Sequence, residues 1–392
     1  MAAIYKEYKC KTMLRMHKYV DNWFWESGSV SPYRACEHGC NYCDGRSKKY
    51  HASEDFDNII HVKINSQEIL RKELDRLFPK QKTLTDFGMK TEGGIIKVKP
   101  VIAISSGISD AYQPAERKYK LTRGILKLFL EYEVPTFVMT KSDLVLRDLD
   151  LLKKINDTTW SNVSFSLSCV DKKITAEFEP IAATPKRRLD AMKKIADCGI
   201  LTGIIFMPVL PYISDSKKQL EETIKASRKK GAKYILAASM TMRDLQAERF
   251  YETLKIHYPE LVEKYKVLYR KGYEPDGKYL KDLYQKIKIL CKENDIQNYI
   301  PRYIPDMKLS KNLEVSTMLF LCAYFLSLDG ERYRAEAFRR LAQTIEDMDE
   351  KIEDIYGQGR LGGIKGIGKN TKELIEEFLE TGKCGYLDEL RG

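Results

Sequence analysis

Three closely spaced cysteines are the residues best suited to chemistry in this chain of 392 residues. They form a CxxxCxxC pattern in the segment Cys36-Glu-His-Gly-Cys40-Asn-Tyr-Cys43. Thiolates at this spacing can converge on one inorganic centre, but three are one short of a complete structural zinc site or cuboidal iron–sulfur cluster. A zinc site would take its fourth ligand from His38, His51 or His61. A [4Fe–4S] cluster would instead leave one iron open to another ligand.

The elements that must position these thiols follow in an alternating pattern. Near-continuous apolar strands separated by helices indicate a parallel sheet covered by helices. With one more strand before Ser31 there would be about six, which suits a partial β/α barrel or a doubly wound sheet. A cysteine loop at the front of such a series favours the iron–sulfur interpretation over zinc. The predicted strands span 101–105, 136–140, 163–168, 203–209 and 234–238, and the predicted helices 117–131, 143–154, 185–198 and 216–230.

Polar residues stand where these predicted strands end. Ser105, Thr140, Lys141, Ser166 and Ser168 all occupy such positions. The C-terminal strand ends form the active-site face of β/α barrels, so chemistry is expected there. The hydroxyl groups could also simply cap the helices that follow.

Charge and composition limit the classes of protein to which this chain can belong. The hydrophobic content of 43% supports a packed core, and nine cysteines are too dilute for a secreted disulfide scaffold. No apolar run approaches about 18 residues, and the N-terminus is charged, so we expect a cytoplasmic protein without a membrane span. The net charge of +11 suggests a polyanionic partner or a solvated lysine-rich surface.

The charge divides the chain near residue 308. Residues 309–392 hold 12 Lys and Arg against 16 Asp and Glu, a net charge of −4, which leaves +15 for residues 1–308. A loop rich in proline and polar residues over 299–306 marks the expected boundary. We therefore predict a catalytic domain over 1–308 and a second domain over 309–392.

The cysteine pattern ahead of a β/α series resembles the radical S-adenosylmethionine (SAM) superfamily. Its surroundings, Ser31-Pro-Tyr-Arg-Ala-Cys36 and Ser109-Asp-Ala-Tyr-Gln-Pro-Ala-Glu116 among them, resemble the spore photoproduct lyase-like (DNA repair photolyase-like) branch. The resemblance implies a partial (β/α)6 barrel whose [4Fe–4S] cluster is held by Cys36, Cys40 and Cys43. It also implies SAM on the open iron, an electron donor such as flavodoxin or ferredoxin, and a 5′-deoxyadenosyl radical that abstracts hydrogen from the substrate.

Other positions carry over from this branch one at a time. Lys141 matches a lysine for the SAM carboxylate, and Ser109 and Ser166 match serines that contact SAM. Tyr42 matches a tyrosine next to the cofactor. Spore photoproduct lyase itself has a hydrogen-donating cysteine just before its Ser-Asp pair and a tyrosine after the third cluster cysteine. Here Ser106, Gly107 and Ile108 precede Ser109, and Asp44 follows Cys43. Cys169, at a predicted strand end, is a candidate substitute donor or else a buried small hydrophobe.

The C-terminal region reads as a helical unit, with helices predicted over 313–326 and 332–348. A Gly-x-Gly turn, Gly366-Ile-Gly368-Lys369, precedes a further helix and would leave backbone amides free for a phosphate. Residues 312–391 resemble the N-terminal 8-kDa domain of family X DNA polymerases, a helix-hairpin-helix module that binds DNA backbone. The position of that family's Schiff-base lysine is Leu374 here, so sugar-phosphate lyase activity is not expected.

Together the two resemblances predict a monomeric radical SAM lyase that repairs a lesion in DNA. Gly366, Gly368 and Lys369 would bind the nucleic-acid backbone. Two other functions stay open: a radical SAM enzyme that modifies RNA, and a lesion sensor that holds a structural metal without catalysis.

Overall fold

The computed structural model describes residues 3–50, 55–79, 90–91, 94–95, 99–105 and 109–392 of the chain. At its centre six parallel strands lie in the order β12-β11-β10-β9-β8-β3, and β2 (Leu14–Met16) pairs antiparallel with β3 at the edge. The described strands form an open sheet, so the predicted partial (β/α)6 barrel is confirmed. The parallel strands are β3 (Gly28–Val30), β8 (Ile102–Ile104), β9 (Thr136–Thr140), β10 (Ser161–Ser166), β11 (Leu201–Val209) and β12 (Ile235–Ser239).

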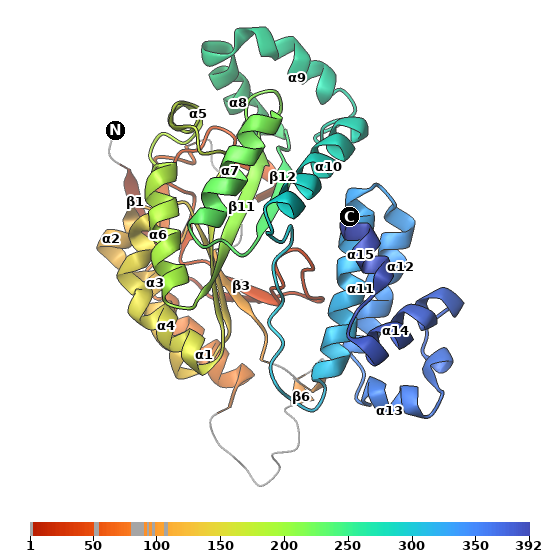
Figure 1. The fold of residues 1–392 in the computed structure, drawn as a ribbon. Helices are drawn as coiled ribbons and strands as arrows, with labels where there is room; N and C mark the ends of the chain where they lie inside the picture. The colour runs from red at the N-terminus through yellow and green to blue at the C-terminus, as the bar shows by residue number, and fades with distance from the viewer. Residues whose placement is uncertain (1–2, 51–54, 80–89, 92–93, 96–98, 106–108) are drawn as a thin grey trace.

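Amphipathic helices cover the outer face of this sheet (Figure 1). Each places an apolar stripe against the strands; α3, for example, buries Ile125 and Phe129 in the same core as Val138 of β9. These helices are α1 (Ser66–Leu77), α3 (Leu121–Glu131), α4 (Leu149–Thr158), α6 (Pro185–Asp197), α7 (Lys217–Lys229) and α10 (Gly277–Glu293). Shorter or peripheral helices are α2 (Ala115–Tyr119), α5 (Lys172–Phe178), α8 (Asp244–His257) and α9 (Val262–Leu268).

Two predicted helices begin differently from the prediction. The helix expected over 117–131 is broken at Lys120, which has a left-handed φ of 52°. The carboxylate of Glu116 accepts a hydrogen bond from the amide of Thr122 at 3.1 Å, and so caps the restarted helix α3. The helix expected over 143–154 starts instead as a 3-10 helix, η3 (Asp143–Asp148), before α4.

A second sheet of three strands, which the sequence pattern did not predict, supports the cysteine loop. It contains β1 (Ile4–Tyr8), β5 (Ile59–Lys63) and β4 (Tyr33–Arg34). A third, two-stranded sheet consists of β6 (Lys90–Thr91) and β7 (Gly94–Ile95). The amide of Cys36 donates to the carbonyl of Phe56 at 3.4 Å, just before β5. These strands carry polar and charged side chains, so they lack the apolar runs from which the main sheet was predicted.

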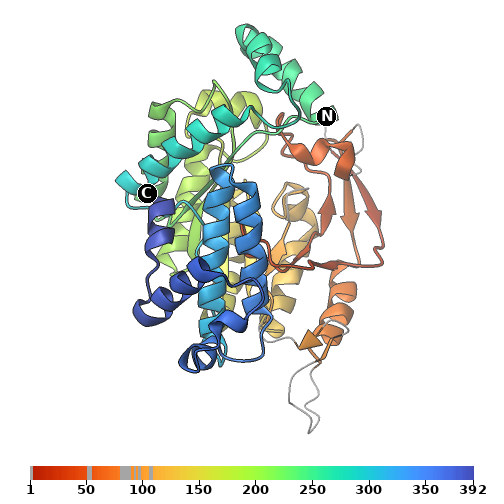
Figure 2. The ribbon, with the colours of Figure 1, turned by 90° about the vertical axis from the view of Figure 1, so that its right-hand side faces the viewer.

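The C-terminal helices pack against the inner face of the main sheet. α11 is buried almost all round its axis, from Asn312 to Leu326, and shares one core with Phe137, Ile205 and Leu236 of the sheet. Figures 1 and 2 show α11 on the side of the sheet opposite the outer helices. The helices of this unit are α11 (Ser310–Leu328), α12 (Arg332–Glu346), α13 (Ile352–Gly357), α14 (Lys369–Thr381) and α15 (Gly385–Arg391).

No helix within the described ranges combines the length and the hydropathy needed to cross a membrane.

Candidate functional site

One cavity of about 470 Å³ opens between the cysteine loop and the inner face of the sheet. It brings together residues that are far apart in the sequence, including all six predicted to bind the cluster or SAM. Cys169 is not among the residues that line it. The predicted residues at its wall are Cys36, Cys40, Tyr42, Cys43, Ser109, Lys141 and Ser166.

The cysteine loop has a backbone that directs its thiols to this cavity. Gly39 adopts a left-handed φ of 64°, which glycine allows without strain, and turns the chain between Cys36 and Cys40. The amide of Cys43 donates to the carbonyl of Cys40 at 3.1 Å and closes the next turn. The guanidinium of Arg46 donates to that same carbonyl at 3.3 Å and to Asp57 at 2.5 Å. The loop is therefore fixed from both sides.

Burial and mutual repulsion disfavour thiolates at these three positions. Burial, and then the nearby charges of Asp110 and the other two thiols, raise the pKa of Cys36 well above its usual value. Burial raises the pKa of Cys40 to about 12 and that of Cys43 to about 11. Three buried thiols that face one cavity would release their protons when a cationic centre compensates the charge, which is how metal binding couples to thiol ionisation.

The described residues around the thiols do not form a site for one metal ion. Among the described residues, no three His, Cys, Asp or Glu side chains are close enough to bind a single metal ion. In a cubane each cysteine binds a different iron, so the sulfur atoms lie further apart than they do around one zinc ion. His38 lines the cavity, but its Nε2 contacts Asp110 at 3.2 Å. His61 lies in β5 and does not line the cavity, and His51 is outside the described residues.

Lys141 and Ser166 meet at the carboxyl ends of two neighbouring strands. The Nζ atom of Lys141 donates to Oγ of Ser166 at 2.6 Å and lies 3.7 Å from Oε1 of Glu179. It also lies 5.3 Å from the centre of the Tyr42 ring. The predicted SAM-binding lysine, one predicted serine and the predicted tyrosine thus form one group beside the cysteines.

Glu179 is the buried anion that holds this group together. Its carboxylate accepts hydrogen bonds from Tyr42, Arg188 and Ser168. Burial alone would raise the pKa of Glu179, but the positive charges of Arg188 and Lys141 outweigh burial and hold it at about 2. Arg188 completes its own coordination by donating to the carbonyls of Ala183 at 2.6 Å and Ser166 at 2.8 Å. The sequence analysis assigned no role to either member of this ion pair.

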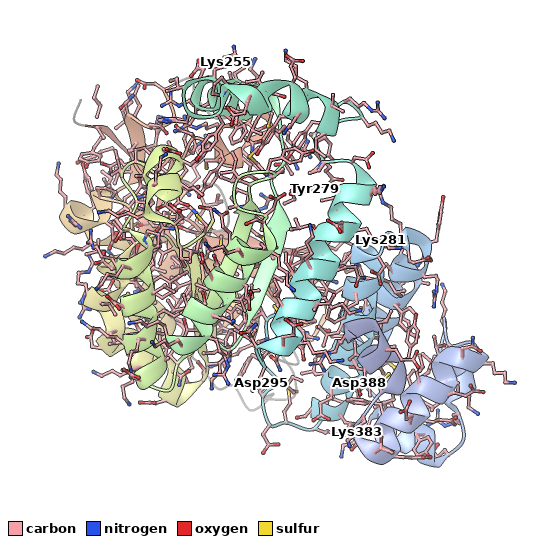
Figure 3. All side chains as sticks on the ribbon, turned by 45° about the horizontal axis from the view of Figure 1, so that its top comes forward. Lys255, Tyr279, Lys281, Asp295, Lys383 and Asp388 are labelled. Atoms are coloured by element: carbon pink, nitrogen blue, oxygen red, sulfur yellow. The ribbon has the colours of Figure 1, made fainter. Side chains whose placement is uncertain are left out.

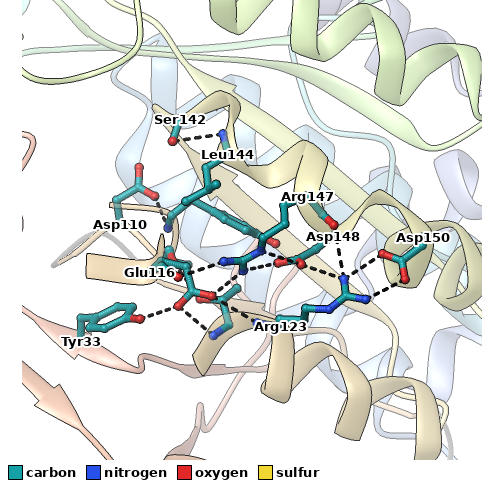
Figure 4. Close-up of polar contacts among 12 residues, drawn as sticks. Tyr33, Asp110, Glu116, Arg123, Ser142, Leu144, Arg147, Asp148 and Asp150 are labelled. Atoms are coloured by element: carbon teal, nitrogen blue, oxygen red, sulfur yellow. Dashed lines mark hydrogen bonds and ion pairs between the residues drawn. The ribbon is translucent and has the colours of Figure 1, made fainter. Parts of the chain in front are cut away.

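Asp110 connects the cysteine loop to the end of β9. Its carboxylate accepts from the hydroxyl of Thr140 and from the amide of Lys141, both at 2.7 Å, and contacts His38. Behind it, Glu116 is paired with Arg147 at 2.5 Å, as Figure 4 shows. The carboxylate of Asp110 therefore fixes the backbone from which the Lys141 side chain extends.

Two predicted site residues have positions that differ from the simple expectation. Ser109 lines the cavity, but its hydroxyl also bonds Ser31 at 3.0 Å and the carbonyl of Tyr33 at 3.1 Å, so it braces the start of the cysteine loop. Cys169 is 1% exposed, and its thiol donates to the carbonyl of Asp171 at 3.7 Å. It lies in one buried cluster with Cys40 and Tyr42, and its role as hydrogen donor stays a prediction. Ser106, Gly107 and Ile108 lie outside the described residues.

The Gly-x-Gly turn lies at the N-terminus of α14 in the C-terminal unit. Gly366 has a φ of 96°, and Gly368 caps α14, where its amide donates to Oγ1 of Thr371 at 2.9 Å. Within the described chain the amides of Gly366 and Lys369 donate to no protein acceptor. Exposed amides at a helix N-terminus are suited to an anion such as a phosphate.

Comparison with protein families agrees with this geometry. The model of the radical SAM superfamily matches residues 30–227, and that of a helix-hairpin-helix domain matches residues 310–384. The first match covers half of the chain, and the protein belongs to the radical SAM superfamily. Its cofactors are a [4Fe–4S] cluster and SAM, as in that superfamily.

Individual relatives agree with the superfamily and leave the reaction open. An uncharacterised protein of Mycobacterium tuberculosis is 29% identical over 248 residues, 62% of this chain and 67% of that protein. An uncharacterised protein of Methanocaldococcus jannaschii is 28% identical over 195 residues, 50% of this chain and 64% of that protein. Among solved structures, a spore photoproduct lyase mutant with bound AdoMet and dinucleoside spore photoproduct has a TM-score of 0.52 at 14% identity, covering 70% of this chain and 77% of that one. This likeness concerns the fold.

We predict that replacing any one of Cys36, Cys40 or Cys43 by alanine lowers the iron content of anaerobically reconstituted protein from about four per chain to near zero. Each thiol would bind a different iron, so two thiols would not retain the cluster. Cys291→Ala and Cys322→Ala are matched controls, because both thiols are buried outside the cavity. Iron and sulfide analysis would contradict the assignment if a cavity variant kept the full content, or if a control variant lost it.

Proposed function

We propose that this protein is a radical SAM enzyme that acts on nucleic acid and repairs a lesion in DNA. One observation carries the proposal: a superfamily member with a thiol-lined cavity has, in the same chain, a helix-hairpin-helix match with free amides at a helix N-terminus. The likeness of the fold to spore photoproduct lyase supports the same reaction class. An electron donor of the flavodoxin or ferredoxin type would reduce the cluster.

The residues of the cavity have separable tasks in this proposal. Cys36, Cys40 and Cys43 would hold the cluster, which with SAM supplies a 5′-deoxyadenosyl radical. The ammonium group of Lys141 would face the carboxylate of SAM, since it is the one lysine that lines the described cavity wall. Glu179 compensates that ammonium until SAM binds, and Asp110 fixes the backbone beside it.

The C-terminal unit would hold the substrate by its backbone. Amides at the N-terminus of α14 can bind a phosphate without reading bases, so they suit a protein that meets a lesion in any sequence. A base within a duplex cannot reach a buried cavity, and the damaged nucleotide would therefore be extruded.

Anaerobic turnover with ultraviolet-irradiated DNA tests the proposal. The reduced, cluster-loaded protein should form 5′-deoxyadenosine faster with irradiated DNA than with undamaged DNA, RNA or no nucleic acid. A rise with RNA alone would favour an RNA-modifying enzyme instead. Failure of every damaged DNA tested to raise the rate would refute DNA repair, and protein that contains zinc without iron or sulfide would indicate a sensor.

We predict that Lys369→Ala weakens binding to duplex DNA by several-fold whatever the sequence, and reduces the slope of log affinity against log salt by about one. Lys369 begins α14 and Lys383 follows its C-terminal end, so Lys383→Ala is the matched control (Figure 3 labels Lys383). Fluorescence anisotropy with a labelled duplex at several salt concentrations measures both quantities. An equal loss of affinity in Lys369→Ala and Lys383→Ala would show that DNA does not bind at the N-terminus of α14.

A further inference from the structure

One acidic side chain, Glu26, faces the end of the cavity remote from the cofactor residues. Glu26 comes two residues before β3 and so lies at the N-terminal end of the sheet, whereas Lys141 and Ser166 lie at C-terminal strand ends. All three line the same cavity, which therefore runs through the interior of the partial barrel. Glu26 is 7% exposed, and its carboxyl group has no hydrogen-bond or ion-pair partner among the described residues.

The neighbouring residue fixes the direction of Glu26. Trp25 has a left-handed φ of 58°, which is rare for a bulky side chain, and so it leaves the cavity side while Glu26 faces inward. The indole Nε1 of Trp25 donates to the carbonyl of Ile300 at 2.6 Å, and the guanidinium of Arg302 lies 5.0 Å from the indole ring. Phe320 of α11, the helix that covers this face in Figure 2, contacts the same ring at 6.0 Å. The loop before α11 and α11 itself thus hold Trp25, the residue next to Glu26, in place.

The cavity around Glu26 suits a flat ring. Aromatic, methionine and isoleucine side chains from two strands, β9 and β11, and one loop line it: Phe24, Phe137, Met139, Ile205 and Met207. Such side chains pack well against planar π systems. A buried carboxyl group without a partner is costly to fold, and a ligand that supplied its hydrogen bonds would remove that cost.

We propose that Glu26 is the substrate-recognition residue of the cavity and pairs with the edge of a nucleobase that presents an N–H group beside a carbonyl group. This inference rests on the proposed function, because it takes the substrate to be nucleic acid. Burial, and then the charge of Asp21, raise the pKa of Glu26 to about 8, so its carboxyl group holds a proton at neutral pH. A protonated carboxyl offers one donor and one acceptor in a plane, which complements an N–H group beside a carbonyl group, as on thymine, uracil or guanine.

Titration calorimetry of the oxidised, cluster-loaded protein with SAM tests this without turnover. Thymidine and 3-methylthymidine are the probes. Thymidine should bind about tenfold more tightly, because the methyl group removes the N–H group from which the carboxyl oxygen of Glu26 would accept a hydrogen bond. Glu26→Leu should abolish the preference, whereas Glu26→Gln, which keeps a donor and an acceptor, should retain it within about twofold.

The exposed Glu248→Leu is the control for loss of a carboxyl group as such. Equal binding of the two nucleosides by the wild-type protein, binding of neither, or an unchanged preference in Glu26→Leu overturns the assignment. If the Glu26 assignment fails in this way but damaged DNA still accelerates 5′-deoxyadenosine formation, the proposed function is unaffected. Failure of the Glu26 assignment can therefore be distinguished from failure of the proposed function.

Discussion

Replacing Glu179 by leucine is expected to lower the free energy of unfolding by about 3–5 kcal/mol. The substitution would leave Arg188 charged and fully buried without its partner. It would also remove the acceptor for the hydroxyl groups of Tyr42 and Ser168. Urea unfolding of the cluster-loaded protein, followed by far-UV circular dichroism, measures the change.

The double variant Glu179→Leu/Arg188→Met separates loss of the pair from loss of packing. Removing both charges eliminates the uncompensated guanidinium, so the double variant should be more stable than the single one. The folded pKa of Glu179, about 2, is below its unfolded value of 4.5. The stabilisation it supplies is therefore present above pH 4.5 and disappears as the pH falls from 4.5 towards 2. A single variant within about 1 kcal/mol of the wild type would show that the pair is not an internal anchor.

Glu26→Gln is expected to stabilise the protein at alkaline pH by roughly 2–4 kcal/mol. The pKa of Glu26 rises from 4.5 in the unfolded chain to about 8 in the folded protein. A raised carboxyl pKa means that the folded state holds a proton that the unfolded state has released, so stability falls as the pH rises from 4.5 to 8. Because glutamine cannot ionise, the free energy of unfolding of the variant should exceed that of the wild type by an amount that grows as the pH rises from 4.5 to 8.

Thermal unfolding of both proteins at pH 5, 6.5 and 8 under anaerobic conditions measures this effect. The exposed Glu248→Gln serves as the control and should differ little from the wild type at any pH. An advantage of Glu26→Gln that is the same at every pH would contradict burial of an ionisable, unpartnered carboxyl group. The cost of burying this carboxyl group is consistent with a role in substrate recognition.

The sequence predicts the parallel sheet well because its strands are buried on both faces. All five strands with predicted limits occur within two residues of them, and β3, which ends at Val30, is the strand expected before Ser31. The second sheet was missed because its strands are short and interrupted by charged or polar residues: β1 contains Lys6 and Glu7, β5 contains His61, and β4 has two residues. The break at Lys120 was missed because it depends on a side chain, Glu116, that caps the helix after the break.

The site was predictable where a spacing or a motif carried the signal. The cysteines, Lys141, Ser109 and Ser166 belong to segments with a recognisable pattern, and all line the cavity. Glu26 belongs to no recognisable motif. Its position directly after Trp23-Phe24-Trp25 could have indicated an acidic side chain in an apolar environment. Packing of α11 on the inner face of the sheet could not be predicted from the sequence, because apolar composition indicates that a helix is buried but not against which surface.

Hydrogen transfer from nucleic acid tests the central claim most directly. Irradiated DNA that carries deuterium at its bases and deoxyribose would be incubated with the reduced, cluster-loaded protein and SAM. The account predicts that deuterium appears in 5′-deoxyadenosine or in recovered SAM, and that Cys40→Ala abolishes the transfer. Formation of unlabelled 5′-deoxyadenosine alone, with the irradiated DNA unchanged, would contradict it.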